Sequence, residues 1–371
     1  MPGHGGVPLQ WYTDRPVQSM SVTEIRIRRA DPEADRDRVL AVLSRNLPAA
    51  ASAARYAWLY LANPSGRSCV WLMEDARTGE PVGTSAGHPK RVRVHGRIET
   101  ALNLGDFAID RAYRALGPAL KLLRATLRPV EDGEFAFSYE HPSEAMLAVY
   151  RRMGGREVGR TERWVRPLEA TSMLVRRWGD GVSVRLLGIA GDAALRARDA
   201  LGRRRHAAQI DLHAGECGPE FDRLDEALAG DTAVRLVRSS EHLAWRYLRS
   251  EIARHQILCA RAGGELRGYL VFRHERDGVL SVVDLVGGRD PGLAAALIAE
   301  LVFHGRALGS RAVWATVLAG SPAARVFPGL DFRRRDSGPG MVIHGPSAAA
   351  EALETLRNPT RWWTLEGDQD V

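Results

Sequence analysis

Residues 106–120 of the chain read DFAIDRAYRALGPAL, and this stretch says most about the fold. Its apolar start is typical of a strand end, and a short turn then opens a helix at Gly117 and Pro118. The first N–H groups of a helix have no partner within the helix, and the helix dipole adds partial positive charge. Gly117 lets a ligand approach the backbone closely. The stretch therefore predicts a phosphate-sized anion site, although an ordinary helix start explains the same pattern.

The sequence on either side alternates between strand and helix patterns. Over residues 23–166 it predicts the order β-α-α-β-β-β-α-β-α-β, in which Asp31 caps the first helix and a later helix covers 117–128. In the second half a less regular segment, 173–240, precedes further strands. These are expected at 256–261, 267–274, 279–286, 311–317 and 331–344, with a helix from Asp290 to Leu308.

A short repeat divides the chain. The motif AWLYL at 57–61 returns as AWRYL at 244–248, and each copy leads into the same series of strands and a helix. Asp106 and Asp284 occupy matching strands of the two copies. The repeat predicts a duplicated α/β unit. Packing is the preferred role for the repeated tryptophans Trp58 and Trp245, with ligand stacking as the alternative.

Length and composition limit the class of protein and the number of domains. The chain has 371 residues, of which 45% are apolar and 26% charged, so it is globular and long enough for two domains. No run approaches the apolar length of a membrane-spanning helix, and the first residues lack the apolar block of a secretion signal. Three separated cysteines favour a cytoplasmic protein without structural zinc, and no metal site is expected. We expect a flexible leader over 1–20 and domains at 21–167 and 168–371.

The net charge of +7 suggests a nucleic-acid ligand, but the distribution of charged residues along the chain favours a smaller anionic ligand. Arginine supplies nearly all of it, since Lys90 and Lys121 are the only lysines, which is typical of codon bias. Residues 1–168 hold 25 basic and 19 acidic side chains, and 169–371 hold 27 and 26. An anionic ligand is therefore expected on the first half. The runs Arg203–Arg205 and Arg333–Arg335 are expected on the solvated surface.

The turn after residue 113 resembles the Q/R-x-x-G-x-G/A phosphate loop of the GNAT superfamily, the acyl-CoA-dependent N-acyltransferases. Arg114, Gly117 and Ala119 match it, and the tyrosine before Arg114 is usual there. Tyr150, four residues before Gly154, resembles the tyrosine of the family's following helix, although the Phe of its usual Gly-Phe is missing. The resemblance covers about 22–166 well and weakens over 240–345. It implies two tandem GNAT-like domains, each a mixed, mostly antiparallel sheet flanked by helices, with a degenerate second copy.

The resemblance also implies where an acyl-CoA co-substrate would bind. The backbone of Phe107, Ala108 and Ile109 would pair with pantetheine like an added strand, and one N–H would steady the thioester oxygen. The loop would hold the diphosphate. Its residues are Arg114, Ala115, Leu116, Gly117, Pro118 and Ala119.

Catalysis would need a proton donor for the leaving thiolate and a group that takes a proton from the amine. Tyr150 is the expected donor. Many relatives have a Glu that acts as general base at the position of Asn103, and an amide cannot take that role. Asp106 is therefore the nearest candidate to orient or deprotonate the amine. A structural hydrogen-bond role for Asp106 is the alternative. Asn103, Glu140 and His141 are weaker candidates for substrate contact, and Glu140 and His141 also for proton relay.

Three hypotheses follow. The first is an N-acyltransferase that moves an acyl group, in the simplest case acetyl, from acyl-CoA or an acyl carrier protein to a small-molecule primary amine, with the first domain catalytic. The second is an aminoacyl-tRNA-dependent transferase of tandem form, which the near-neutral second copy disfavours. The third is a non-catalytic acyl-CoA sensor. The paired Trp362 and Trp363 are expected to anchor the tail on a domain face or to wall a substrate cleft.

Overall fold

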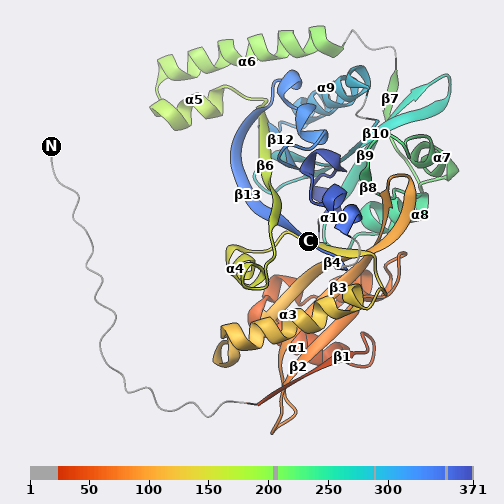
Figure 1. Cartoon of the computed structure of the whole chain (residues 1–371). Coiled ribbons are helices and arrows are strands. Elements are labelled where there is room, and N and C mark those ends of the chain that lie inside the picture. Colours follow the sequence, from red (N-terminus) through yellow and green to blue (C-terminus); the bar gives the residue numbers. More distant parts are fainter. Residues whose placement is uncertain (1–23, 204–207, 288–289, 347–349, 370–371) are drawn as a thin grey trace.

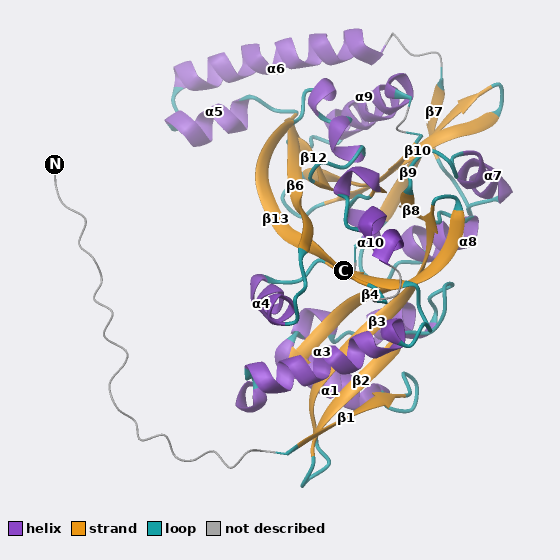
Figure 2. Cartoon of the chain, in the orientation of Figure 1, coloured by secondary structure: helices purple, strands orange, loops and turns teal. Residues whose placement is uncertain are grey.

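The strands of both halves join one sheet that runs through the molecule, and helices cover it (Figures 1 and 2). The computed structural model describes residues 24–203, 208–287, 290–346 and 350–369. Within these residues the sheet has fourteen strands, with parallel and antiparallel neighbours. The mixed α/β class expected from the sequence is therefore confirmed. The expected leader, residues 1–20, lies outside the described residues.

The first half follows the expected order of elements closely. A difference lies at Asp31, whose carboxylate accepts the N–H groups of Glu33 and Ala34 in a turn, so that the helix begins later, at Arg36. The elements are β1 (Ile25–Ala30), α1 (Arg36–Asn46), α2 (Ala53–Tyr56), the π-helical η2 (Ala57–Leu61), β2 (Cys69–Asp75), β3 (Pro81–Val94), β4 (Arg97–Ile109), α3 (Leu116–Glu131), β5 (Phe137–Glu140), α4 (Glu144–Arg152) and β6 (Glu157–Pro167).

The second half contains the expected strands, but the segment 173–240 is far more regular than its sequence pattern indicated. It holds α5 (Thr171–Trp178), the 22-residue α6 (Val182–Arg203), β7 (Gln209–Leu212), α7 (Pro219–Ala227), β8 (Val234–Leu236) and the start of α8 (Ser240–Leu243). The remaining elements are η4 (Ala244–Leu248, also π-helical), β9 (His255–Ala262), β10 (Glu265–His274), β11 (Val279–Val286), α9 (Pro291–Ala307), β12 (Ala312–Leu318), β13 (Arg333–His344), α10 (Ala350–Leu356), β14 (Trp362–Trp363) and η8 (Glu366–Asp368).

Strand β2 shows how the sequence builds the layers of the first half. Successive side chains of a strand point to opposite faces of the sheet. Trp71 and Met73 pack in the cluster that contains the leucines of α3, whereas Val70 and Leu72 pack with the apolar side chains of α1. All seven residues of β2 are buried. The strand is therefore covered on both faces, which explains its unbroken apolar run.

The two halves exchange their last long strands, β6 and β13. In the sheet order, β5 of the first half pairs with β13 of the second, β13 pairs with β6, and β6 pairs with β12. Each final strand thus lies between strands of the other half. The division at residue 167 remains a prediction, and the exchange means that the two units share one continuous sheet.

The repeated motif lies at the contact between the halves. The rings of Trp58 and Trp245 stack with their centroids 4.9 Å apart. Each indole also donates to the other's backbone: Trp58 Nε1 lies 2.9 Å from the Trp245 carbonyl, and Trp245 Nε1 lies 3.0 Å from the Trp58 carbonyl. This reciprocity is the signature of a local two-fold relation. The packing role predicted for the two tryptophans is confirmed.

The arginine run at 333–335 and the tail also follow their predictions. Arg333, Arg334 and Arg335 are exposed, whereas part of the run at 203–205 lies outside the described residues. Trp362 and Trp363 are buried, and the short strand they form pairs with β8. No helix within the described residues has the length and apolar character to cross a membrane.

Candidate active site

Strands β4 and β5 run side by side for only three residue pairs and then separate. Their parallel ladder extends from Ala101 and Phe137 to Asn103 and Tyr139. Beyond that pair, β4 continues to Ile109 paired, among the described strands, only with β3, while β5 ends at Glu140 and is paired with β13 on its other side. Neither backbone is paired with the other past this point, so β4 offers free N–H and C=O groups toward the gap.

A cavity of about 270 Å³ opens at this separation. Strand β4, the end of β5 and the start of α4 form most of its wall. The lining residues are Arg55, Leu104, Gly105, Asp106, Phe107, Glu140, His141, Pro142, Ser143 and Met146. The cavity is thus about half apolar and half polar, which is more polar than most small-molecule sites.

Asp106 sits on a β-bulge of β4. The pairing of β3 with β4 shifts between Thr84 and Ala86, so that Asp106 and Phe107 lie opposite one residue. Asp106 has a φ of 50°, a conformation that Asp tolerates better than most residues. The bulge directs its carboxylate to Arg55, whose Nη1 lies 2.7 Å from Oδ2, and to the hydroxyl of Tyr60, 2.5 Å from the same oxygen. The carboxylate therefore lines the cavity as half of a buried ion pair.

The second half builds the same kind of cluster. Asp284 of β11 accepts the hydroxyl of Tyr247, the repeat partner of Tyr60, at 3.3 Å. Arg238 takes the place of Arg55, with Nε 2.8 Å from Asp284 Oδ2. This half lacks a matching phosphate loop, yet it keeps the tyrosine–aspartate–arginine arrangement. The shared cluster argues that Asp106 fixes the bulged strand to the π-helical segment in addition to any role in chemistry.

Tyr150 reaches the cavity through Glu140. It lies buried on α4, and its hydroxyl donates to Glu140 Oε2. Tyr150 does not line the cavity, whereas Glu140 does. Burial, together with the neighbouring carboxylate, raises the pKa of the Tyr150 hydroxyl well above its usual range. The tyrosine is therefore always protonated at physiological pH.

His141 faces the cavity as a neutral imidazole. Burial lowers its pKa from 6.5 to about 4. Neither ring nitrogen has a hydrogen-bond partner among the residues that the structure describes. Such orphaned buried nitrogens are costly unless a ligand pairs with them. Asn103, at the base of the gap, donates to the Tyr139 carbonyl at 3.2 Å, and its Oδ1 is also unpartnered within the described residues.

The turn after β4 leads to an uncapped helix. Ala115, the N-cap residue of α3, is extended, and within the described residues no side-chain capping bond forms at this helix start. Gly117 and Leu116 are exposed, and a Cβ added at Gly117 would meet nothing within 4 Å. Arg114 donates to the Ile109 carbonyl at 3.1 Å and to Asn46 Oδ1 at 3.1 Å, which holds the end of β4 against α1. The N–H groups at the start of α3 therefore face solvent, beyond the open end of the gap.

The N-terminus of the matching helix in the second half, α9, is capped by a side chain. Asp290, the N-cap of α9, accepts the N–H groups of Gly292 at 2.8 Å and Leu293 at 3.2 Å. Its carboxylate therefore occupies the position that a bound anion takes at an open helix start. The charge on this aspartate also repels a phosphate group.

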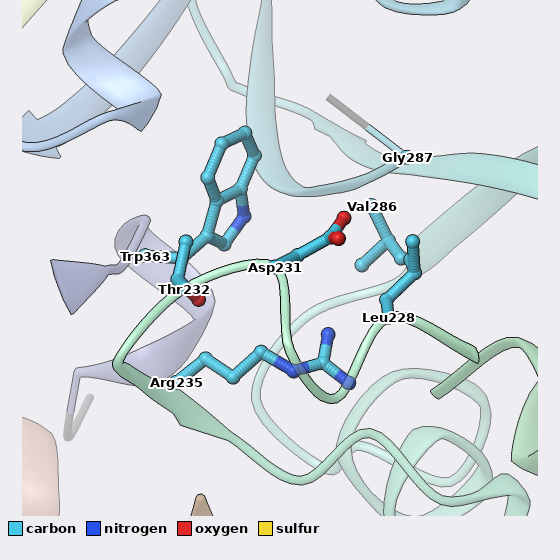
Figure 3. A pocket seen from close by; sticks show the side chains of 7 residues that line it. All are labelled: Leu228, Asp231, Thr232, Arg235, Val286, Gly287 and Trp363. Atoms are coloured by element: carbon cyan, nitrogen blue, oxygen red, sulfur yellow. The ribbon is translucent and has the colours of Figure 1, made fainter. Parts of the chain in front are cut away.

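The chain's own tail occupies the matching gap between β11 and β12. These strands pair from Val279 and Ala312 to Val282 and Ala315 and then separate, as β4 and β5 do. Leu365 bridges to Val317 of β12, and Trp363 Nε1 donates to the Leu285 carbonyl of β11 at 2.9 Å. Figure 3 shows Trp363 beside Val286 and Gly287 at the end of β11, where a pocket of only about 20 Å³ remains. That volume holds one water molecule at most.

The structure thus brings Asp106, Phe107, Glu140 and His141 to one cavity. It places Tyr150 behind Glu140, and the loop residues 114–119 beyond the end of β4. Arg55 is a cavity residue that the sequence analysis did not identify; it lies two residues before the AWLYL repeat, whose Tyr60 shares its partner Asp106. No cluster of three or more His, Cys, Asp or Glu side chains suited to a metal ion exists within the described part of the chain.

Comparison with known proteins supports the fold through structure rather than sequence. No protein-family model matches the chain, and no curated protein matches it in sequence. A GCN5-related N-acetyltransferase from Anabaena variabilis superposes with a TM-score of 0.61 at 14% identity, covering 86% of this chain and 72% of that one. A probable N-acyltransferase from Enterococcus faecalis gives 0.62 at 13% identity, with the same coverage.

A third similar structure is N-myristoyltransferase from Saccharomyces cerevisiae with bound myristoyl-CoA. It gives a TM-score of 0.54 at 12% identity and covers 90% of this chain and 85% of that one. Together with the separated β4 and β5 and the bulge at Asp106, these similarities define the class: the chain has the fold of the GCN5-related N-acetyltransferases, the GNAT fold. At these identities the similarity concerns the fold alone.

Proposed function

We propose that this protein is an acyl-CoA-dependent N-acyltransferase whose first half carries the active site. The observation that supports it best is the gap between β4 and β5, with a cavity of about 270 Å³ at its base and the uncapped start of α3 at its mouth. A pantetheine arm can pair with a free strand edge, and a diphosphate can bind to free helix N–H groups. Both features follow each other along one segment, β4–α3.

The helix start favours CoA over an acyl carrier protein as the donor. Both carry pantetheine, but CoA adds a diphosphate at its far end, which gains from the N–H groups of Leu116 and Gly117. The second half cannot bind a CoA diphosphate in this way, because Asp290 caps α9 and the tail fills the gap between β11 and β12. We therefore assign donor binding to the first half.

The reaction is attack of an amine on the thioester carbonyl. The nitrogen–carbon bond forms, the carbon–sulfur bond breaks, and the amine loses a proton while the thiolate gains one. A backbone N–H at the bulge, beside Phe107, stabilises the developing oxyanion. Tyr150 supplies the proton to the sulfur, and its hydroxyl is bonded to Glu140, which lines the cavity.

Glu140 and His141 are better placed than Asp106 to receive the amine. Asp106 is balanced by Arg55, so it adds little net charge to the cavity. Glu140 brings a carboxylate that attracts an alkylammonium group, and neutral His141 offers a ring nitrogen to accept a hydrogen bond from the amine. The acceptor is accordingly a small molecule with a primary amine.

Release of free thiol tests the proposal directly. The protein is incubated with acetyl-CoA and a panel of primary amines, and thiol is followed with a chromogenic disulfide reagent, while native mass spectrometry records donor binding. We expect bound acetyl-CoA and amine-dependent thiol release. Binding without turnover for any amine would support an acyl-CoA sensor. Absence of CoA binding, with salt-sensitive binding of aminoacyl-tRNA, would replace the proposal by the tRNA-dependent transferase.

A further inference from the structure

The hairpin of α5 and α6 carries the most exposed apolar side chains of the described chain. Val182, Leu186 and Ile189 are 78%, 63% and 61% exposed. They recur at i, i+4 and i+7, so they lie along one side of α6. Trp178, at the end of α5, is 62% exposed and lies next to the turn that joins the helices. Figure 1 shows this hairpin at the periphery, with α6 as the outermost element.

Another side of α6 is fixed to the protein, so the apolar side cannot turn inward. Gly188 packs so closely on α5 that an added Cβ would lie 2.6 Å from Thr171 Oγ1. Asp192 accepts the Thr171 hydroxyl at 2.7 Å. Asp199 pairs with Arg166 and Arg306, each at 2.6 Å. The inner contacts are therefore small or charged, and the large apolar residues remain outside.

The charged residues of the hairpin are also divided between its sides, with two aspartates engaged on the inner side and arginines exposed on the outer side. Residues 171–203 hold six arginines and three aspartates. Asp192 and Asp199 are engaged on the inner side, and Asp180 pairs with Arg185 in the exposed turn region. Arg196 is exposed one heptad after Ile189, and Arg177 is exposed beside Trp178. The outer face of the hairpin, meaning Trp178, Val182, Leu186, Ile189 and Arg196, is therefore apolar with a positive border.

We propose that this outer face docks on an anionic lipid surface. An amphipathic helix with apolar residues on one side and arginines at their border lies in the interface of a membrane, and anionic headgroups strengthen its binding. Tryptophan prefers the same depth. A second copy of the chain is a poorer occupant, because a two-fold contact would bring the arginine borders together while the three aspartates of the hairpin already have partners.

Sedimentation with lipid vesicles tests this inference independently of acyl transfer. The full-length protein is mixed with vesicles of phosphatidylcholine alone, or of phosphatidylcholine with phosphatidylglycerol. We expect binding to the anionic vesicles that weakens as salt is raised. The double variant Leu186→Glu, Ile189→Glu should bind at least about tenfold more weakly, since it removes apolar contact and adds negative charge.

Controls separate this result from misfolding and from self-association. Leu308→Glu alters another exposed leucine, 56% exposed after α9, and should bind vesicles like the unchanged protein. Circular dichroism should be the same for all variants because the altered side chains are exposed. Absence of binding to both vesicle types overturns the proposal. So does a dimer in solution that the double variant converts to a monomer, since the face would then join two copies.

Discussion

Tyr150 has two properties that fit a proton donor: its hydroxyl is protonated at physiological pH, and it is held by a carboxylate that lines the cavity. The variant Tyr150→Phe keeps the packing of the ring and removes only the hydroxyl. We expect kcat for acyl transfer to fall about 100-fold, the lower end of what a positioned proton donor contributes. Affinity for acetyl-CoA, measured by calorimetry, should be unchanged.

Tyr269 provides the matched control. It is equally buried, lies on β10 of the second half, and its hydroxyl has no hydrogen-bond partner among the described residues. Tyr269→Phe should therefore leave both kcat and stability close to the unchanged protein. If Tyr150→Phe retained full activity, the thiolate would have to gain its proton from another source.

His141 also makes stability depend on pH. Burial lowers the pKa of His141 to about 4, and that of His255, which also lies near Arg246 and Arg273, to about 4. The unfolded chain takes up these protons below about pH 6.5, while the folded chain takes them up only near pH 4. The unfolded state thus binds more protons in this window, so the free energy of unfolding falls as pH drops from about 6.5 toward 4.

The loss can be assigned to one residue by substitution. Each histidine should cost about 2 kcal/mol between pH 7 and pH 5, measured by urea denaturation. His141→Gln should remove about that part of the decrease, whereas His95→Asn, at an exposed turn, should leave it in place. An unchanged pH dependence in His141→Gln would mean that the His141 ring is solvated in the folded protein.

At the scale of elements, the start of α3 differs from that of α9 in one respect that decides anion binding. In the part of the chain that the structure describes, no side chain caps the first turn of α3, whereas Asp290 caps α9. Gly117→Glu would place a carboxylate where the diphosphate is proposed to bind, in a position where a Cβ meets nothing within 4 Å. We expect the dissociation constant for CoA to rise about tenfold or more, equivalent to about 1.4 kcal/mol, without loss of stability.

Calorimetry with CoA and thermal melting give the two readouts for this variant. Gly117→Ala controls for the backbone, and it should bind CoA nearly as well as the unchanged protein. Gly329→Glu adds the same charge at another open position, where a Cβ also meets nothing within 4 Å, and it should not affect CoA. Equal CoA binding by Gly117→Glu would place the donor elsewhere.

The elements also show which features could be predicted from the sequence. Strands such as β2 and β11 have long apolar runs, and α3 has leucines at helical spacing, so their existence follows from local pattern. The hairpin of α5 and α6 was missed for a physical reason. Its inner side uses Gly188 and Gly191 and its outer side uses leucine and isoleucine, so the apolar periodicity of α6 does not mark the side that packs on the protein.

At the scale of the whole molecule, the repeat predicted a duplication but not how its copies join. The reciprocal contact of Trp58 and Trp245 follows from the shared motif. The exchange of β6 and β13 does not, because strands with similar patterns can pair with either neighbour and the sequence does not specify which. Prediction of the site from the sequence has the same limit. The sequence indicates Asp106 and Tyr150 as site candidates, but it does not indicate that Asp106 pairs with Arg55. That pairing depends on a β-bulge and on a contact between residues 51 positions apart in the chain.

The C-terminal tail affects the function of the whole molecule, because under the proposed function it leaves only the first half able to bind acyl-CoA. Trp363 and Leu365 fill the gap between β11 and β12, and Asp368 pairs with Arg238 at 2.9 Å, beside Asp284. A pantetheine arm would need the space that these residues occupy. We therefore expect one acyl-CoA per chain, measured by calorimetry or native mass spectrometry at saturating donor.

Two variants distinguish the tail from the helix cap as the cause of this stoichiometry. Asp290→Ala frees the start of α9 but leaves the tail in place, so the chain should still bind one acyl-CoA. Trp363→Ala removes a buried ring and should lower the free energy of unfolding by about 3–5 kcal/mol, while binding in the first half persists at conditions where the chain is folded. Two acyl-CoA molecules bound to the unchanged chain would show that the tail leaves the second gap during binding, and the assignment of donor binding to the first half alone would then fail.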